Sequence, residues 1–326
     1  MKDKWKALAA VEASLNKQFN TTSSIVRLGN KVNIPLPSIS TGLPTFDYDV
    51  VGTGGIPRGR VVEILGAESG GKTTFCLTVT ASEQNQGGIC AFIDSEHSLD
   101  VTYANNLGVD VDNLVVSQPD SGEQALETVE ALVDSGAVSL IVVDSVAALV
   151  PQAELDGEMG SSHMGLQARL MSQAMRKLRG KCHALNVTIL FTNQIREKIG
   201  VFYGSNETSP GGRALRFYAS LRLDIRKIGG EAGQLKEGTQ TIGHKVKIKA
   251  IKNKVGIPFK ETQFNLIYGK GFDKDTDLIQ YAINSGTVEQ KGAWCSFDGE
   301  SYRKDQLIDI KDKLMEAIKK TKEIKI

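Results

Sequence analysis

The chain has 326 residues, of which 40% are hydrophobic and 24% are charged. This is ordinary globular usage, so the composition argues against a disordered, collagenous or coiled-coil protein, and the length suggests about two domains of unequal size. The net charge is +1. A polyanionic partner therefore has to be held by local basic patches, because the summed charge gives almost no long-range attraction.

The cysteines and the apolar runs indicate where in the cell we expect the protein. Four cysteines lie far apart and form no C-x-x-C pair, which argues against a zinc cluster or a disulfide scaffold and favours the reducing cytoplasm. The apolar run near the N-terminus is interrupted at Glu12, so it is too short for a signal peptide. No stretch approaches the roughly 20 apolar residues that span a bilayer, and we expect no membrane association.

The first twenty residues predict an amphipathic helix. Its apolar residues recur at helical spacing and are Trp5, Leu8, Val11, Leu15 and Phe19. Residues 21–40 contain turn formers and two prolines without a clear period, and indicate an extended linker. The pattern leaves open whether the helix packs on its own domain or on a neighbouring subunit.

From about residue 60 the chain alternates between short β-branched runs and segments of helical period. The runs are VVEIL, ICAFID, LIVVD and VTILFTN, and such alternation predicts βαβ units with a mostly parallel sheet. The run that ends at Asp144 is apolar almost throughout, as in a central strand buried on both faces. Residues 220–226 and 244–252 alternate instead, so we expect antiparallel strands there, followed by a boundary at 269–277 and a small α/β module.

Residues 66–73, GAESGGKT, fit the pattern G-x-x-x-x-G-K-[ST] between a predicted strand and a predicted helix. In this context backbone N–H groups and the helix N-terminus face nucleotide phosphates. Lys72 then reaches the β and γ phosphates, and the Thr73 hydroxyl binds magnesium. We expect the nucleotide to be held by Gly66, Glu68, Ser69, Gly70, Gly71, Lys72, Thr73 and Thr74.

Phosphoryl transfer also needs a carboxylate near magnesium and a group that orients or deprotonates water. Asp144, which closes an apolar strand, is the candidate on the metal side. Asp94 and Glu96 both lie where another strand ends, at the sheet edge that binds ligands in open α/β folds, and spacing alone cannot separate them. Gln194, at the end of a third strand, is a candidate sensor of the γ-phosphate.

Two segments are candidates for nucleic-acid contact. Residues 195–213 have no period and combine cations with apolar and aromatic side chains, as expected for single-strand binding, although a lid over the nucleotide is the alternative. The loop DGEMGSSH precedes a predicted helix at about 164–185. On that helix a stripe of Met171, Met175, Leu178, Cys182 and Leu185 faces the core, while Arg169, Ser172, Arg176 and Arg179 share another face that is either solvated or bound to phosphate.

Seven segments together resemble the RecA family of bacterial DNA strand-exchange recombinases. They are GAESGGKT, FIDSEHSLD, IVVDSVAAL, SHMGLQARLMSQAMRKL, TNQIREKIG, ETSPGGRALRFYAS and IKNKVGIPFK, and the resemblance covers about residues 5–295. It implies an α/β fold: an N-terminal helix arm and linker over 1–34, a RecA-type P-loop ATPase core with a mostly parallel sheet over 35–270, and a small C-terminal α/β domain over 271–326. It also implies a DNA-dependent ATPase that uses ATP and Mg²⁺ and forms helical filaments on single-stranded DNA.

The resemblance assigns roles within the nucleotide site. Glu96 matches the carboxylate that activates water, which decides against Asp94. Asp144 matches the residue on the magnesium side, and Gln194 matches the γ-phosphate sensor beside a DNA loop. The family also places Asp100, Tyr103 and Tyr268 around adenine, and Lys252 and Lys254 reach the phosphates held by the neighbouring subunit.

The partners that the resemblance implies are single-stranded DNA, homologous double-stranded DNA and further copies of this chain. Residues 156–165 and 195–212 match the DNA-binding loops. We expect DNA contacts from Met164, Arg169, Ser172, Arg176, Arg196, Lys198, Ile199, Gly211, Gly212 and Arg213. Ile25 matches the arm that docks on the next subunit, and Phe217 matches a residue of the same interface. Self-cleavage of LexA-type repressors and loading by recombination mediators are secondary expectations for DNA repair and the SOS response.

The sequence departs from the family pattern in three places. Pro210 stands where the family usually carries threonine, and Arg213 adds a charge where a neutral side chain is common. The segment DIKDKLMEAIKKTKEIKI is rich in lysine, whereas family members usually finish with an acidic tail that restrains duplex binding. On this pattern we expect duplex DNA to be admitted at lower free magnesium, and a copy carried by a phage or mobile element is conceivable.

Two other classes of protein share parts of this pattern. A hexameric helicase motor would hydrolyse ATP as a closed ring, but it has no need for the N-terminal docking helix and the two DNA loops together. A non-catalytic filament scaffold would bind DNA and nucleotide without turnover, but it has no need for Glu96.

Overall fold

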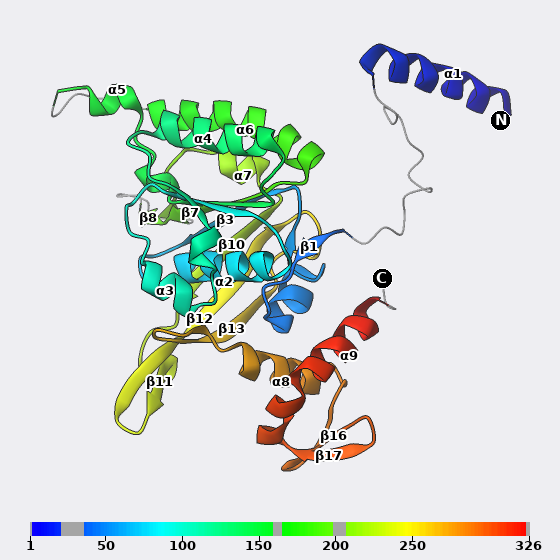
Figure 1. The fold of residues 1–326 in the computed structure, drawn as a ribbon, viewed down its shortest axis with the longest axis vertical. Coiled ribbons are helices and arrows are strands. Elements are labelled where there is room, and N and C mark those ends of the chain that lie inside the picture. The colour runs from blue at the N-terminus through cyan, green and yellow to red at the C-terminus, as the bar shows by residue number, and fades with distance from the viewer. Residues whose placement is uncertain (1, 21–35, 159–164, 198–206, 324–326) are drawn as a thin grey trace. The chain divides into compact units, whose positions relative to one another are not determined.

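The computed structural model describes residues 2–20, 36–158, 165–197 and 207–323 (Figure 1). The chain divides into an N-terminal unit within residues 1–35 and a large unit, residues 36–324. In the N-terminal unit the expected helix is α1, Lys2–Phe19. Three of its apolar residues, Trp5, Leu8 and Phe19, are 47%, 49% and 62% exposed.

A ten-stranded sheet forms the centre of the large unit, in the order β14-β13-β12-β10-β3-β7-β6-β4-β5, with β11 paired to β12. The strands are β3 (Val61–Gly66), β4 (Cys90–Asp94), β5 (Val115–Ser117), β6 (Leu140–Asp144), β7 (Thr188–Gln194), β10 (Leu221–Lys227), β11 (Gln234–Glu237), β12 (Gln240–Asn253), β13 (Glu261–Ile267) and β14 (Gly271–Phe272). β3, β4, β5, β6 and β7 pair in parallel. The four β-branched runs are therefore strands of a parallel sheet, as the sequence predicts.

The expectation for residues 220–226 was wrong in part. β10 pairs in parallel with β3, where Leu221 lies opposite Val62, and antiparallel with β12 on its other edge. The change from parallel to antiparallel pairing therefore lies between β10 and β12, one strand later than the alternation predicts. Alternation reports which side chains are buried, and it does not report the direction of the neighbouring strand.

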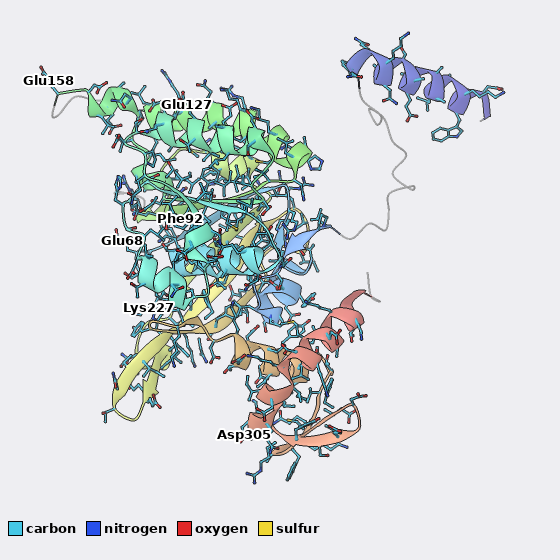
Figure 2. All side chains as sticks on the ribbon, viewed as in Figure 1. Glu68, Phe92, Glu127, Glu158, Lys227 and Asp305 are labelled. Atoms are coloured by element: carbon cyan, nitrogen blue, oxygen red, sulfur yellow. The ribbon has the colours of Figure 1, made fainter. Side chains whose placement is uncertain are left out.

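Each face of the sheet carries its own core. On one face α2 (Lys72–Asn85) and α3 (Val101–Asn106) cover residues such as Phe92, which lies within the layer (Figures 1 and 2). On the other face α4 (Gly122–Ser135) and α6 (Leu166–Leu185) pack together. The predicted stripe of α6 is buried except at Leu185, which is 43% exposed because the helix ends there.

Residues 274–323 form a smaller layer with a core of its own. It contains α8 (Lys274–Asn284), the antiparallel strands β15 (Glu289–Lys291), β16 (Trp294–Phe297) and β17 (Glu300–Arg303), the 3₁₀ helix η6 (Lys304–Ile310) and α9 (Lys311–Glu323). β14 lies beyond the expected start of this module at 271, yet it pairs with β13 of the large sheet.

Short elements complete the large unit. They are β1 (Ser38–Ile39), β2 (Ile56–Pro57), β8 (Arg196–Glu197), β9 (Glu207–Thr208), α5 (Gln152–Leu155), α7 (Ala214–Tyr218), the π-helix η2 (Thr45–Val51) and the 3₁₀ helices η3 (Val111–Asn113), η4 (Val146–Ala148) and η5 (Glu231–Gly233). Within the described part of the chain, no helix has the length and apolar character needed to cross a membrane.

Candidate nucleotide and DNA-binding site

The Gly-rich loop joins the end of β3 to the start of α2. Gly71 precedes the helix with φ of 94°, and a Cβ atom on it would lie 2.9 Å from Leu266 Cδ1. A Cβ on Gly66 would lie 2.1 Å from the carbonyl oxygen of Ile225. Only glycine fits these positions, so the loop backbone can present its N–H groups at the N-terminus of α2.

Lys72 is held across this loop. Its Nζ donates hydrogen bonds to the carbonyl oxygens of Gly66, at 3.1 Å, and Ala67, at 2.8 Å. Burial lowers the pKa of Lys72, while the carboxylates of Asp144 and Glu96 act in the opposite direction. The exposed side chain of Glu68 lies in the same loop (Figure 2). The ammonium group is therefore aimed at the space where the phosphate loop would hold an anion.

Asp144 connects the loop to the centre of the sheet. Its Oδ2 accepts a hydrogen bond from Thr73 Oγ1 at 2.6 Å, and its Oδ1 accepts one from Thr192 Oγ1 at 2.5 Å. Burial raises the pKa of Asp144, and both hydrogen bonds oppose this shift. The carboxylate and the hydroxyl are the hard oxygen donors that Mg²⁺ prefers, so this donor set fits the metal that the sequence predicts.

The structure distinguishes Asp94 from Glu96. Asp94 is fully buried, and its carboxylate accepts hydrogen bonds from the N–H groups of Ser98 and Leu99 and from the side chain of Gln118. It therefore shapes the turn after β4. Glu96 points into the site instead, where its Oε1 accepts from the hydroxyl of Ser145.

Gln194 contacts Glu96 directly. Its Nε2 donates to Glu96 Oε1 at 3.3 Å. Gln194 ends β7, and β8 begins two residues later at Arg196, which is exposed. A chain of contacts therefore runs from the expected water-activating carboxylate to the start of the second candidate DNA loop.

The candidate adenine residues lie at two separate elements of the fold. Tyr103 shares a hydrogen bond with Thr74 Oγ1 at 2.9 Å, and Asp100 caps α3 by accepting from the N–H of Tyr103. Tyr268 is half exposed, and its ring lies 5.6 Å from that of His244. No direct contact between Tyr268 and Tyr103 is recorded among the described residues.

Gln167 joins the bases of the two DNA loops, and the sequence interpretation missed it. Its Nε2 donates to the carbonyl oxygens of Val146, at 2.8 Å, and Leu149, at 3.1 Å. Its Oε1 accepts from the N–H of Gly211 at 3.1 Å. A long polar side chain at the second residue of a helix gives no motif, so only the contacts of α6 with η4 reveal this role.

Gly211 and Gly212 both have positive φ angles, of 77° and 74°, and a Cβ on Gly211 would lie 2.8 Å from Val146 Cγ1. Arg213 follows them as the exposed N-cap of α7. Asn193 donates to the carbonyl oxygen of Pro210 at 3.2 Å. Of the other residues predicted to contact DNA or a neighbouring subunit, Met164, Lys198, Ile199 and Ile25 lie outside the described residues.

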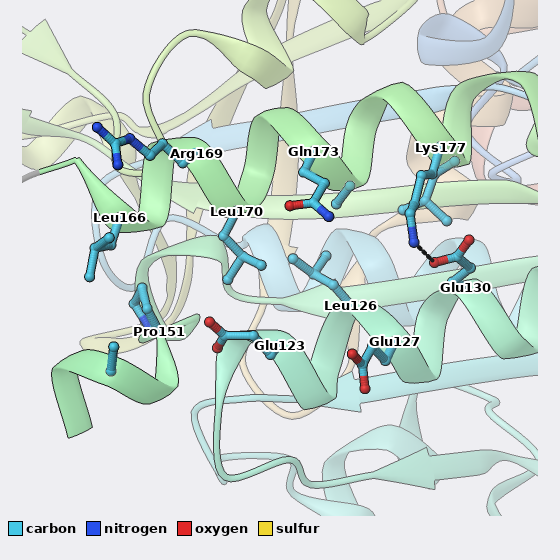
Figure 3. A pocket seen from close by; sticks show the side chains of 13 residues that line it. Glu123, Leu126, Glu127, Glu130, Pro151, Leu166, Arg169, Leu170, Gln173 and Lys177 are labelled. Carbon is cyan, nitrogen blue, oxygen red and sulfur yellow. Dashed lines mark hydrogen bonds and ion pairs between the residues drawn. The ribbon is translucent and has the colours of Figure 1, made fainter. Parts of the chain in front are cut away.

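The arginines of α6 do not share one environment. Arg169 lines a groove between α4 and α6 with Gln173 and Lys177, and Lys177 pairs with Glu130 at 2.9 Å (Figure 3). Arg176 and Arg179 instead line a second cavity. Ser172 Oγ donates to the carbonyl oxygen of Ala168 at 2.7 Å. The single basic face expected for this helix is therefore divided.

Lys252 and Lys254 converge on the C-terminal end of α7. Lys252 Nζ donates to the carbonyl oxygens of Arg216, at 2.6 Å, and Phe217, at 3.1 Å, and Lys254 Nζ lies 3.5 Å from the Phe217 oxygen. The side chain of Phe217 is 65% exposed. Three residues assigned to one interface by resemblance thus form one patch.

Comparisons with known proteins agree with this geometry. The model of the RecA N-terminal domain family matches residues 6–273. The chain belongs to the RecA family. It is 54% identical over 298 residues to Protein RecA of Nocardioides sp., covering 91% of this chain and 83% of the relative. Protein RecA of Rubrobacter xylanophilus is 53% identical, with 91% and 85% covered, and that of Chloroherpeton thalassium is 54% identical, with 91% and 82% covered.

Membership of the RecA family fixes the class of activity. The chain is a DNA-dependent ATPase of homologous recombination that forms filaments on single-stranded DNA and exchanges strands with a homologous duplex, as the resemblance in the sequence implies. It acts in DNA repair and the SOS response. The RecA fold, with its mostly parallel sheet and P-loop, is the fold observed here.

Proposed function

We propose that this chain hydrolyses ATP with Glu96 as the group that activates water and with Gln194 as the link to DNA. The observation that carries the proposal is the contact between Gln194 Nε2 and Glu96 Oε1 at 3.3 Å, because it joins the two groups directly. Asp94 is a poor candidate for the same role, since three donors already occupy its carboxylate.

The remaining nucleotide contacts follow from the loop. The backbone of residues 66–73 and the ammonium group of Lys72 bind the phosphates, and Tyr103, Asp100 and Tyr268 contact the base. The oxygen atoms of Thr73 and Asp144 would hold magnesium, which when bound would neutralise charge on the phosphate oxygens. Asp144 is suited to this because its carboxylate is fixed by two hydroxyl groups.

Glu96 takes the proton of the attacking water in this proposal. Its neighbours, the hydroxyl of Ser145 and the amide of Gln194, both donate to the carboxylate, which keeps it oriented. When DNA shifts the segment after Gln194, the amide is free to turn toward the γ-phosphate. Hydrolysis would then depend on DNA through one side chain.

We propose that assembly completes the site. Lys252 and Lys254 would reach the phosphates of the neighbouring subunit, with Phe217 packed at the same interface. The support is that both ammonium groups contact the carbonyl oxygen of Phe217, whose side chain is exposed. The N-terminal helix would dock on that neighbour through its exposed apolar face.

The wider assignments rest on the family alone. DNA would be contacted by Arg169, Ser172, Arg176, Arg196, Gly211, Gly212 and Arg213 among the described residues. We extend the proposal to LexA-type repressors and recombination mediators as partners, and to the cytoplasm, whose reducing conditions suit the four free and buried cysteines.

ATP hydrolysis with and without single-stranded DNA tests this proposal, with Glu96→Gln as the variant and Glu127→Gln on the exposed face of α4 as the matched control. We expect strong stimulation by DNA in the parent and control, and loss of turnover in Glu96→Gln while filaments still form. Turnover in Glu96→Gln equal to the parent would refute the role of Glu96. Hydrolysis that ignores DNA in the parent would refute the coupling.

A further inference from the structure

A cavity of about 740 Å³ lies beside the C-terminal half of α6, away from the nucleotide loop. The charged and histidine side chains that line it are Arg60, Arg176, Arg179, His183 and Lys254. No Asp or Glu is among its described lining residues. The cavity therefore concentrates positive charge in a chain whose net charge is only +1.

Arg60 and His183 fix one wall of this cavity. Arg60 Nη1 lies 2.6 Å from His183 Nδ1. A guanidinium group can only donate, so His183 Nδ1 is the acceptor in this contact. The remaining N–H groups of Arg60 stay available, in the planar arrangement that matches the oxygen atoms of a phosphate.

Two arginines that line this cavity have no matching carboxylate among the described residues. Within the described residues, no ion pair is recorded for Arg176 or Arg179. The pKa of Lys252 is lowered to about 8 by burial and by Lys254 and Arg222; Glu63 opposes this shift, and Arg179 adds a smaller lowering. A bound anion would relieve this repulsion.

Two further features indicate the kind of anion. Tyr218 lines the cavity, and an aromatic side chain beside arginines is the combination that binds a base together with its phosphates. Arg176 stands on the same helix as Ser172, one turn further from the DNA loop that precedes α6. The cavity thus continues the predicted DNA-contacting side of α6 toward Arg60.

We propose that this cavity is a binding site for the phosphate backbone of a nucleic-acid strand, with Arg60, Arg179 and His183 as contacts beyond the two DNA loops. The proposal rests on the DNA binding of the RecA family and not on the roles proposed for Glu96 and Gln194. If experiments refute this binding site, the roles proposed for the residues of the nucleotide site still stand.

Gly180 offers a clean probe of the cavity. It lines the wall within α6, and a Cβ on it would meet no atom within 4 Å. Gly180→Glu therefore places a carboxylate among the cations without a clash, and Gly180→Gln is a neutral control of the same shape. Both changes replace glycine inside a helix with a better helix former, so both variants are expected to fold.

The experiment measures binding of labelled single-stranded DNA to the full chain at increasing salt, with magnesium and a slowly hydrolysed ATP analogue. We expect Gly180→Glu to raise the dissociation constant for DNA about tenfold, because the added carboxylate repels the phosphates of the strand. Gly180→Gln should leave it unchanged. Arg179→Ala should reduce the slope of log K against log salt by about one.

Three results would overturn the proposal. One is unchanged DNA binding and salt slope in Gly180→Glu and Arg179→Ala, which would mean a solvated cavity. A second is a raised KM for ATP in the absence of DNA with unaltered DNA binding, which would assign the cavity to nucleotide phosphates. A third is equal loss of self-assembly in Gly180→Glu and Gly180→Gln, which would assign it to packing between subunits.

Discussion

The nucleotide end of the sheet and the basic cavity differ in how their charges are matched. At the strand ends, Asp94 and Asp144 are fixed by hydrogen bonds from neighbouring strands and turns. In the cavity, Arg176 and Arg179 have no recorded carboxylate partner within the described residues. Matched groups hold their geometry in the isolated chain, whereas unmatched cations gain their stabilisation only when an anion arrives.

The largest effect is expected at Asp144. Asp144→Asn replaces an acceptor of two hydroxyl hydrogen bonds by an amide and removes the charge opposite magnesium, so hydrolysis should fall by at least about 100-fold. Steady-state hydrolysis across a magnesium series is the measurement, with the exposed Asp120→Asn as control. Near-parental turnover at ordinary magnesium would remove Asp144 from the metal site.

Arg222, which pairs with Glu63, should contribute more to the free energy of unfolding than Arg179 does. Arg222 Nε donates to the buried Glu63 Oε2 at 2.5 Å. Arg222→Ala would leave that charge buried, so the free energy of unfolding should fall by about 3–5 kcal/mol. Arg179→Ala should change the free energy of unfolding by less than about 0.5 kcal/mol, since no carboxylate among the described residues loses its partner. Denaturant unfolding of both variants checks this, and equal losses would contradict the distinction.

The stability of the large unit should depend on pH through Asp277. Its carboxylate accepts from the N–H of Thr45, and burial raises its pKa to about 6. The folded chain then binds this proton more tightly than the unfolded chain. The contribution is therefore complete below pH of about 4 and is lost as the pH rises through about 6, by at most about 3 kcal/mol.

Asp277→Asn should flatten this pH dependence, whereas Asp275→Asn, at an exposed neighbouring position paired with Lys311, should not. Thermal unfolding at pH values between 4 and 8 gives the comparison. Burial raises the pKa of Asp47 to about 7, so Asp47 also lowers stability as the pH rises, and it contributes to the slope that remains in Asp277→Asn. A parental slope in Asp277→Asn would exclude Asp277 as its source.

The smallest effect is expected at Arg213, an exposed cation at the start of α7. Arg213→Ala should weaken single-strand binding and reduce the salt slope by about one, because one phosphate contact is lost. Binding titrations at several salt concentrations measure this slope. An unchanged slope would mean that Arg213 does not contact a phosphate.

The sequence predicted best what depends on local pattern. The β-branched runs and the Gly-rich loop became β3, β4, β6, β7 and the turn before α2, because burial on both faces and tight turns leave direct signals in composition. The direction of β10 was missed, since alternation carries no information on the neighbouring strand. Gln167 and the division of the α6 arginines were missed because both depend on which helices pack against α6.

The competition between Asp94 and Glu96 illustrates the limit of spacing. Two carboxylates two residues apart at a strand end look equivalent in the sequence. The difference arises from donors that are remote in the chain, namely Gln118 for Asp94, and Ser145 and Gln194 for Glu96. Family resemblance favours Glu96 over Asp94 as the carboxylate that activates water, and these contacts give a physical reason to prefer the same residue.

In the coupling that we propose, DNA stimulates hydrolysis through the contact between Gln194 and Glu96. The most direct test compares hydrolysis with and without single-stranded DNA in Gln194→Ala, with the exposed Gln173→Ala on α6 as control. We expect Gln194→Ala to keep ATP binding and the rate of hydrolysis without DNA, but to lose the stimulation of hydrolysis by DNA. Full stimulation in Gln194→Ala would contradict it.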